Sequence, residues 1–258
     1  MSGDTDHRSK FVQEFDQWAH LTNVYRAEEF VLRTFLEKDK RTLEAGCGGG
    51  RLLLILKSWG FTDLHGYDFL PAFIEVARSR DESGTIDYRV MDATQLDYSD
   101  NSFDQLLLMQ QILCFLPSVA DQQRAVREAF RVLRPGGIVV VCVLAERARR
   151  QLLLHKIMLG YFSLLRTLTR HRLSTQFLPW MRTNKKKINL KALLDRGPYL
   201  YWFRESEVID LFESAGFEVV SLGTNAQAAE GRFVAKVDEL KNAQFRGGLY
   251  LVCKKPSS

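Results

Sequence analysis

The sequence lacks the features that mark membrane-spanning, secreted or metal-binding chains. No stretch of about 18 uncharged apolar residues occurs, which argues against a transmembrane helix. The first ten residues are polar, so we expect no secretory signal. The four cysteines are widely spaced and form no CxxC pair, which favours buried free thiols in a reducing compartment. We therefore expect a cytoplasmic protein with no bound metal.

Acidic residues are absent from one long segment. Residues 147–194 contain twelve Lys or Arg and no Asp or Glu, whereas the whole chain has a net charge of +5, so the remainder carries −7. The segment is also rich in leucine. Such an asymmetry concerns the partners of a protein rather than its fold. We expect a basic, helical lid over residues 147–200, which divides the chain into residues 1–146, 147–200 and 201–258.

Strands and helices alternate on either side of this insertion. Residues 8–38 have a helical pattern with a break near Thr22-Asn23. The predicted strands are Arg41–Ala45, Leu64–Tyr67, Ile86–Met91, Phe103–Met109, Ile138–Leu144, Phe217–Leu222 and Leu249–Val252. Helices are expected between them, and the uninterrupted apolar run at Ile138–Leu144 indicates burial on both faces, as in a parallel sheet. The alternation predicts an α/β fold with a doubly wound sheet.

A glycine-rich loop follows the first predicted strand. Gly46, Gly48 and Gly50 permit a sharp turn and a close approach to a ligand, and the next helix begins with free N–H groups beside it. A dinucleotide site would have a glycine where Arg51 stands, and Glu44 would repel a pyrophosphate. A phosphate-binding P-loop is excluded because no Gly-Lys-Ser/Thr sequence follows.

Polar residues also follow the next strands of the predicted sheet. Asp68 lies 22 residues beyond Gly46, where a carboxylate can accept both hydroxyls of a ribose. Asp92 follows the third strand and can accept a hydrogen bond from an adenine amine, and Gln110 ends the fourth. Asp68 and Asp92 also suit helix caps or turns, but four features in step with four strands favour a nucleoside site.

At these residues the chain resembles the class I S-adenosylmethionine (SAM) dependent methyltransferases, in particular the ubiquinone/menaquinone-type group (methyltransferase type 11-like). The segments that carry the resemblance are Leu43–Arg51, Gly66–Pro71, Met91–Ala93, Phe103–Asp104 and Leu133–Gly137. The resemblance implies a Rossmann-like seven-stranded sheet, mostly parallel with an antiparallel last strand. It also implies SAM as cofactor, with S-adenosylhomocysteine as product. The residues that it implies for cofactor binding are Glu44, Gly46, Cys47, Gly48, Gly50, Asp68, Phe69, Asp92, Ala93 and Gln110.

The catalytic base does not follow from the resemblance. Many relatives have a histidine near the position of Phe115, and this chain has none there. The candidates for a base are His20, Glu146, His155 and His171, each of which also suits a structural or solvated role.

The basic, leucine-rich insertion favours an acceptor that is a small molecule, a lipid-linked molecule or a glycan, methylated on oxygen or nitrogen. It also suits peripheral contact with an anionic membrane. An alternative is methylation of tRNA or another RNA, with Lys185-Lys186-Lys187 on phosphates and Tyr199, Tyr201 and Trp202 stacked on bases. A further alternative is a non-catalytic scaffold that binds SAM.

Overall fold

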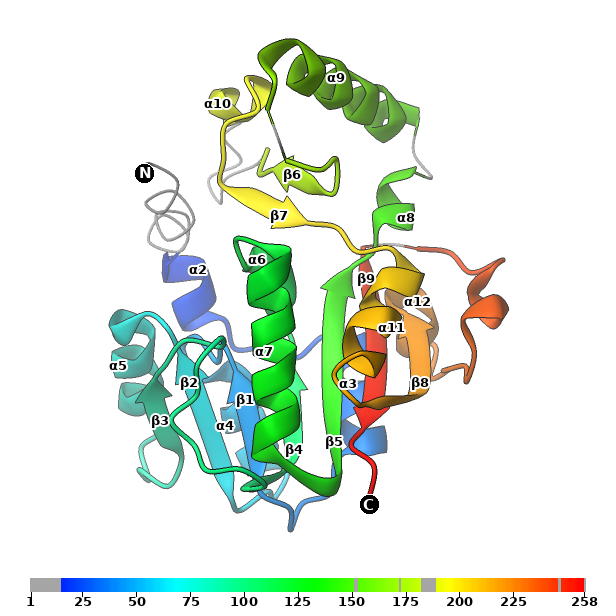
Figure 1. The fold of residues 1–258 in the computed structure, drawn as a ribbon. Helices are drawn as coiled ribbons and strands as arrows, with labels where there is room; N and C mark the ends of the chain where they lie inside the picture. The colour runs from blue at the N-terminus through cyan, green and yellow to red at the C-terminus, as the bar shows by residue number, and fades with distance from the viewer. Residues whose placement is uncertain (1–14, 151–152, 172, 182–188, 246, 258) are drawn as a thin grey trace.

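The computed structural model describes residues 15–150, 153–171, 173–181, 189–245 and 247–257. Its centre is a seven-stranded sheet with the strand order β3-β2-β1-β4-β5-β9-β8 (Figure 1). The strands are β1 (Thr42–Ala45), β2 (Leu64–Asp68), β3 (Asp87–Val90), β4 (Phe103–Leu108), β5 (Leu133–Leu144), β8 (Glu218–Thr224) and β9 (Gly248–Lys254). The pairs from β3 through β5 are parallel, and β9 is antiparallel to both β5 and β8. The predicted fold class, including the antiparallel last strand, is confirmed.

Helices cover both faces of this sheet, which explains the uninterrupted apolar run in β5. Val139, Val141 and Val143 belong to one core cluster, whereas Val140 and Cys142 belong to the other. The first face is covered by α7 (Val119–Val132) and α11 (Glu205–Glu213), and the second by α3 (Arg26–Phe35), α4 (Arg51–Ser58), α5 (Pro71–Arg80) and α12 (Asn225–Ala229). Two adjacent cores on opposite faces are what a buried parallel sheet requires.

Several boundaries differ from the sequence prediction. Strand β5 begins at Leu133 rather than Ile138, because a register shift between Phe103 and Gln105 of β4 lets Leu133 pair with Phe103 ahead of the main ladder. A short helix, α6 (Ile112–Phe115), follows β4 and was not anticipated. Helix α7 begins with a cap, in which the Ser118 hydroxyl accepts a hydrogen bond from a backbone N–H in the first turn.

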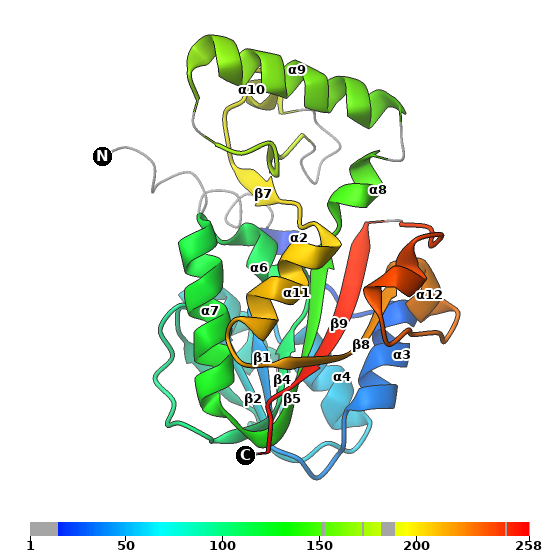
Figure 2. The same cartoon turned by 45° about the vertical axis from the view of Figure 1, so that its right-hand side comes forward.

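The insertion lies over the end of the sheet at which β5 finishes (Figures 1 and 2). It contains α8 (Glu146–Arg150), α9 (Leu153–Thr169), β6 (Phe177–Pro179), α10 (Leu190–Leu193) and β7 (Tyr199–Tyr201). The prediction of a helical insertion is right for its three helices, but β6 and β7 form an antiparallel two-stranded sheet that was not expected. Strands of three residues are too short to give a period in the sequence.

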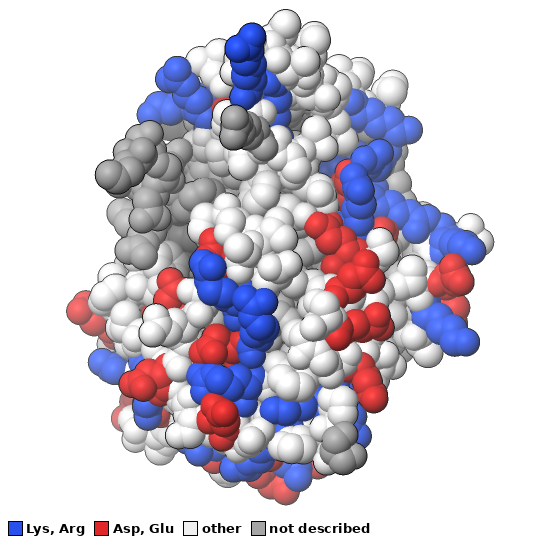
Figure 3. Space-filling model, viewed as in Figure 1, with Lys and Arg blue, Asp and Glu red and all other residues white. Residues whose placement is uncertain are grey.

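One buried ion pair holds the insertion together. The guanidinium of Arg166 donates to both carboxylate oxygens of Asp195, at 2.6 and 2.7 Å, and also to the Phe177 carbonyl. Figure 3 shows Lys and Arg with few acidic residues over the upper part of this face. Among the described residues, no helix is both long and apolar enough to cross a membrane.

Candidate functional site

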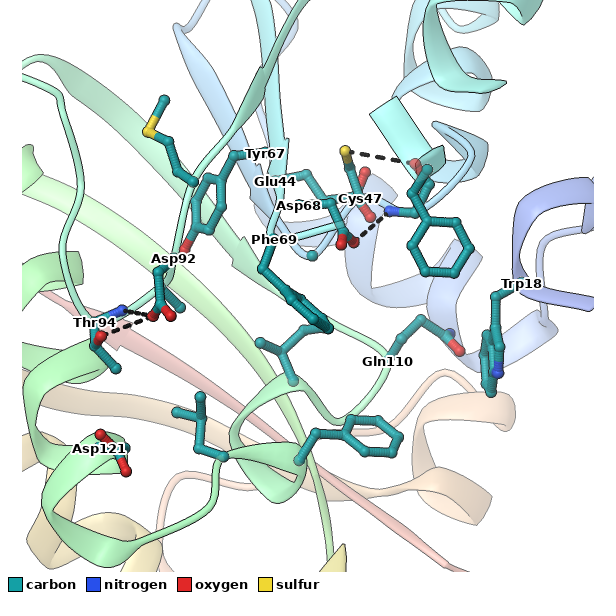
Figure 4. A pocket seen from close by; sticks show the side chains of 18 of the residues that line it. Trp18, Glu44, Cys47, Tyr67, Asp68, Phe69, Asp92, Thr94, Gln110 and Asp121 are labelled. Carbon is teal, nitrogen blue, oxygen red and sulfur yellow. Dashed lines mark hydrogen bonds between the residues drawn. The ribbon is translucent and has the colours of Figure 1, made fainter. Parts of the chain in front are cut away.

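A cavity of about 350 Å³ lies at the carboxyl ends of β1, β2 and β4 (Figure 4). Its lining brings together nine of the ten residues predicted to hold a cofactor: Glu44, Gly46, Cys47, Gly48, Asp68, Phe69, Asp92, Ala93 and Gln110. Gly50 is not part of the lining. Gly50 is the N-cap residue of α4 and has a φ of +77°. An added Cβ would lie 2.5 Å from the Tyr88 hydroxyl, so a glycine is required here by packing against Tyr88.

The glycine loop is joined to the N-terminal helix α2 (Phe15–His20). A Cβ added at Gly49 would lie 1.9 Å from the Ala19 carbonyl oxygen, so only glycine permits this approach. The guanidinium of Arg80 donates to the carbonyls of Ala19, Leu21 and Gly49, at 2.9, 3.2 and 2.8 Å. A side chain from α5 therefore fixes the loop and the segment after α2 relative to each other, and Leu21 and Trp18 of that region form a wall of the cavity.

Asp68 fixes the loop from the other side. Its Oδ2 accepts a hydrogen bond from the Gly48 N–H and its Oδ1 accepts one from the Leu70 N–H, each at 3.0 Å. Burial raises the pKa of Asp68 to about 6, in spite of these two bonds, which favour the charged form. A carboxylate oxygen has more than one acceptor position, so both oxygens can still accept bonds from a pair of hydroxyls.

Glu44 is the carboxyl in the cavity whose pKa is raised most. Its side chain is buried, and its Oε2 has no hydrogen-bond partner among the residues that the structure describes. Burial raises the pKa of Glu44 to about 8, although the nearby Arg51 favours the charged form. A buried carboxylate with an unpaired oxygen is costly unless a cation or donor approaches it. The site therefore fits a ligand that brings a positively charged donor to the end of β1.

A buried network that the sequence did not predict lies next to Glu44. Arg51 donates to both oxygens of Glu28, at 2.8 and 2.9 Å, and to the Asn23 carbonyl at 2.7 Å, and the Gln110 amide also donates to Glu28. The sequence pattern gives no sign that Arg51 pairs with a distant acidic residue. Gln110 and Gln111 have φ of 53° and 61°, a strained conformation for such residues that occurs often at functional sites.

The adenine side of the predicted site is a turn after β3. Asp92 Oδ1 accepts bonds from the Thr94 N–H and hydroxyl, at 2.8 and 2.7 Å, which orients the exposed carboxylate. The opposite wall is apolar and aromatic. It includes residues that sequence reasoning did not assign to the site: Trp18, Leu21, Phe73, Ile112, Phe115 and Leu116. A periodic apolar stripe, such as the one that contains Trp18, does not distinguish a core residue from a cavity wall.

The four candidate bases do not line this cavity. His20 is exposed at the end of α2. Glu146 is paired with Arg150 at 2.6 Å and with Arg204 at 3.0 Å, and His171 lies against Asp195 at 3.3 Å. His155 lines a different cavity. A base must reach the acceptor atom, so the role of these residues as bases stays a prediction.

Comparison with known proteins identifies the central part of the chain. Residues 43–141 match the family described as methyltransferase domain. The demethylmenaquinone methyltransferase of Thermus thermophilus is 36% identical over 110 residues, which are 41% of this chain and 48% of that protein. The chain thus spans about half the length, or less, of the curated relatives that it matches.

Solved structures share the fold across nearly the whole chain. A SAM-dependent methyltransferase from Methanosarcina mazei has a TM-score of 0.66 at 21% identity, with coverage of 92% of this chain and 100% of that one. The cyclase SpnF has a TM-score of 0.57 at 22% identity, with coverage of 90% and 81%. The predicted class I methyltransferase fold is confirmed. The fold alone does not set the reaction, because one of these neighbours is named a cyclase.

Proposed function

We propose that the chain is a SAM-dependent methyltransferase and that SAM binds in the 350 Å³ cavity. The observation that carries the proposal is the unpaired Oε2 of the buried Glu44, which suits the ammonium group of the methionine moiety. Asp68 would accept the ribose hydroxyls and Asp92 the adenine amine, while the glycine loop approaches the ligand with its backbone. The match of residues 43–141 to a methyltransferase domain supports the same assignment.

Bound SAM supplies a methyl group on a sulfonium, which is already an excellent leaving group. The chain's own contribution is to hold the reactants in line and to keep water out. Trp18, Ile112 and Phe115 form an apolar wall that serves the second task. The described residues of this wall include no histidine, so the acceptor would need either an intrinsically nucleophilic atom or a base such as a carboxylate.

The affinity of SAM for two variants tests the cofactor assignment. Asp68→Ala removes the acceptor of the Gly48 N–H as well as the proposed ribose contact, and we expect the dissociation constant to rise at least about tenfold in calorimetry. Asp238→Ala is the matched control, because Asp238 is 82% exposed and lies outside the cavity lining. An unchanged dissociation constant for Asp68→Ala would refute the assignment.

We further propose that the acceptor is a small molecule with an apolar body, methylated on oxygen or nitrogen. The apolar cavity wall supports this, as does the relative named a demethylmenaquinone methyltransferase. The RNA alternative loses part of its basis, since Tyr201 and Trp202 are 2% and 7% exposed and are not available for stacking on bases. Lys185-Lys186-Lys187 lie outside the described residues.

A screen with isotopically labelled SAM separates the acceptor classes. Mass spectrometry would resolve the labelled products into small-molecule, lipid, glycan and RNA fractions. Label in the small-molecule or lipid fraction supports the proposal, and label confined to RNA overturns it. Binding of SAM without any labelled product would identify the chain as a scaffold.

We also propose that residues 147–200 form an acceptor-side unit that rests on an anionic membrane. On α9, Leu153, Ile157, Leu164 and Leu168 are 74, 62, 60 and 73% exposed, and their spacing places them on one helix face. The surrounding segment carries an excess of cations, which attracts anionic lipid rather than a second copy of the same basic surface.

Vesicle flotation tests this contact. The chain should float with phosphatidylglycerol vesicles and much less with phosphatidylcholine vesicles, and Ile157→Glu should abolish flotation. Val220→Glu is the control, because Val220 is also an exposed apolar residue, at 43%, but lies on β8. If Ile157→Glu leaves flotation unchanged, or instead splits a dimer in light scattering, the membrane proposal is wrong.

A further inference from the structure

The insertion contains a second cavity, of about 1250 Å³. Its walls come from α8, α9, the β6–β7 pair, residues 241–245 and Gly247, and it shares no lining residue with the first cavity. Strand β7 contributes to this second cavity through Leu200 and packs against α6, which lines the first. A ligand here would therefore lie in a compartment of its own, and the proposed methyl transfer does not require it.

Three nitrogen atoms in residues that line this cavity are buried without hydrogen bonds. Arg149 Nε, His155 Nδ1 and Trp202 Nε1 have no partner among the residues that the structure describes. Trp202 is more than nine-tenths buried, and the Arg149 guanidinium lies 4.2 Å from the centroid of its ring. Arg149 Nε and Trp202 Nε1 are donors, whereas His155 Nδ1 donates or accepts according to the tautomer of the ring. An unsatisfied buried donor costs free energy, so two of them in one cavity indicate a ligand that accepts hydrogen bonds.

One cation in the lining of this cavity has no counter-ion. Among the residues that the structure describes, the lining contains no Asp or Glu. Two arginines of α8 have acidic partners: Arg147 Nη1 lies 3.9 Å from Glu205 Oε1, and Arg150 is paired with Glu146. Arg149, on the same helix, has no acidic partner among the described residues. Burial lowers the pKa of Arg149, and burial together with that guanidinium lowers the pKa of His155. A desolvated cation without a counter-ion is unfavourable, and an anion would remove that cost.

The remaining walls are apolar and include Met158, Leu178, Leu200 and Phe245. We propose that this cavity binds an amphiphilic anion, with a carboxylate or phosphate head at Arg149 and Trp202 and a hydrocarbon body along the apolar walls. Such a ligand satisfies the unpaired donors and the uncompensated charge together. A free amphiphile and a lipid from a membrane present the same chemistry.

Calorimetry with the full chain and three probes tests the chemical class. Dodecyl phosphate has both the head and the body, dodecanol has only the body, and inorganic phosphate has only the charge. We expect dodecyl phosphate to bind below its micellar concentration, and the other two at least about tenfold more weakly. Equal binding of dodecanol would show that the cavity is merely apolar and would overturn the proposal.

Variants locate the head group. Arg149→Met should weaken dodecyl phosphate at least about tenfold, while Trp202→Phe keeps a ring for stacking, loses the indole N–H and should weaken it about three- to tenfold. Arg150→Met is the matched control, with the same loss of charge on the same helix outside the cavity lining. Affinity for SAM, measured in parallel, should stay unchanged and so separates this proposal from the proposed methyltransferase function. Wild-type affinity of dodecyl phosphate in both Arg149→Met and Trp202→Phe would refute the site.

Extraction of fluorescent phosphatidic acid from vesicles distinguishes the two sources. Extraction that depends on Arg149 identifies a membrane lipid as the ligand, and binding of dodecyl phosphate without extraction identifies a free amphiphile. Both outcomes support the site, and failure of both overturns it.

Discussion

Raising the pH from about 6.2 to about 7.0 should strengthen the binding of SAM, because Glu44 has to lose its proton to face a cationic ammonium group. Burial raises the pKa of this carboxyl to about 8. Its ionised share then rises from about 2% to about 9% across this interval, which predicts an increase in affinity of about five- to sixfold. At about pH 7, binding should release about 0.9 proton for each SAM bound.

Calorimetry in two buffers of different ionisation enthalpy measures both the affinity for SAM at each pH and the number of protons released on binding. Glu44→Gln is the control, because it keeps the shape of the side chain and removes the titration. The pKa of Asp68 is raised to about 6, so this acid also titrates near the lower limit, and the slope that remains in Glu44→Gln accounts for it. An identical pH dependence and proton release in wild type and Glu44→Gln would refute the role of Glu44.

The same ionisation affects the stability of the ligand-free chain. The folded-state pKa of Glu44 lies above its ordinary value of 4.5, so the folded state binds the proton more tightly than the unfolded state. The contribution of Glu44 is therefore fully present below about pH 4.5 and is lost as the pH rises toward about 8. Glu44→Gln should flatten this part of the stability profile in thermal melts.

Four further substitutions test the packing of the chain by chemical denaturation. Gly49→Ala places a Cβ against a backbone carbonyl and should destabilise the fold by about 1–3 kcal/mol, whereas Gly160→Ala, in α9 with nothing within 4 Å, should stabilise it by about 0.5–1 kcal/mol. The reverse order would contradict the close approach. Glu28→Gln leaves the buried Arg51 without its counter-ion and should cost about 3–5 kcal/mol; a cost under about 1 kcal/mol would show that the pair is solvated. Ser118→Ala removes the cap of α7 and should cost about 1 kcal/mol, while a neutral effect would mean that the cap is redundant.

The sequence predicted the sheet, and it singled out residues that the structure gathers in one cavity, for a physical reason. The positions of the strands along the chain are encoded in apolar runs, and the predicted ligand residues lie at or just beyond the carboxyl ends of these strands, so local patterns locate both. Asp68, for example, is found by its spacing from Gly46, and the structure places both in the lining of one cavity.

Contacts between distant segments have no such local signal. Glu28 is hydrogen-bonded to Arg51, 23 positions away, and to Gln110, 82 positions away. The local sequence around these three residues does not predict the network. His155 and His171 were candidate bases because of their chemistry, but their distance from the cavity depends on how the insertion folds. That fold includes β6 and β7, which are too short to be recognised in advance.

The bonds of Arg80 have a consequence for dissecting the chain into modules. The segment that matches the methyltransferase family begins at residue 43, yet Trp18 and Leu21 form a wall of its cavity and Glu28 neutralises its buried Arg51. A fragment that began at residue 43 would keep the glycine loop and Arg80. It would lose the carbonyls of Ala19 and Leu21, to which Arg80 donates. The smallest autonomous unit should therefore begin before α2, and residues 15–35 belong with the cavity even though they lie outside the segment that matches the family.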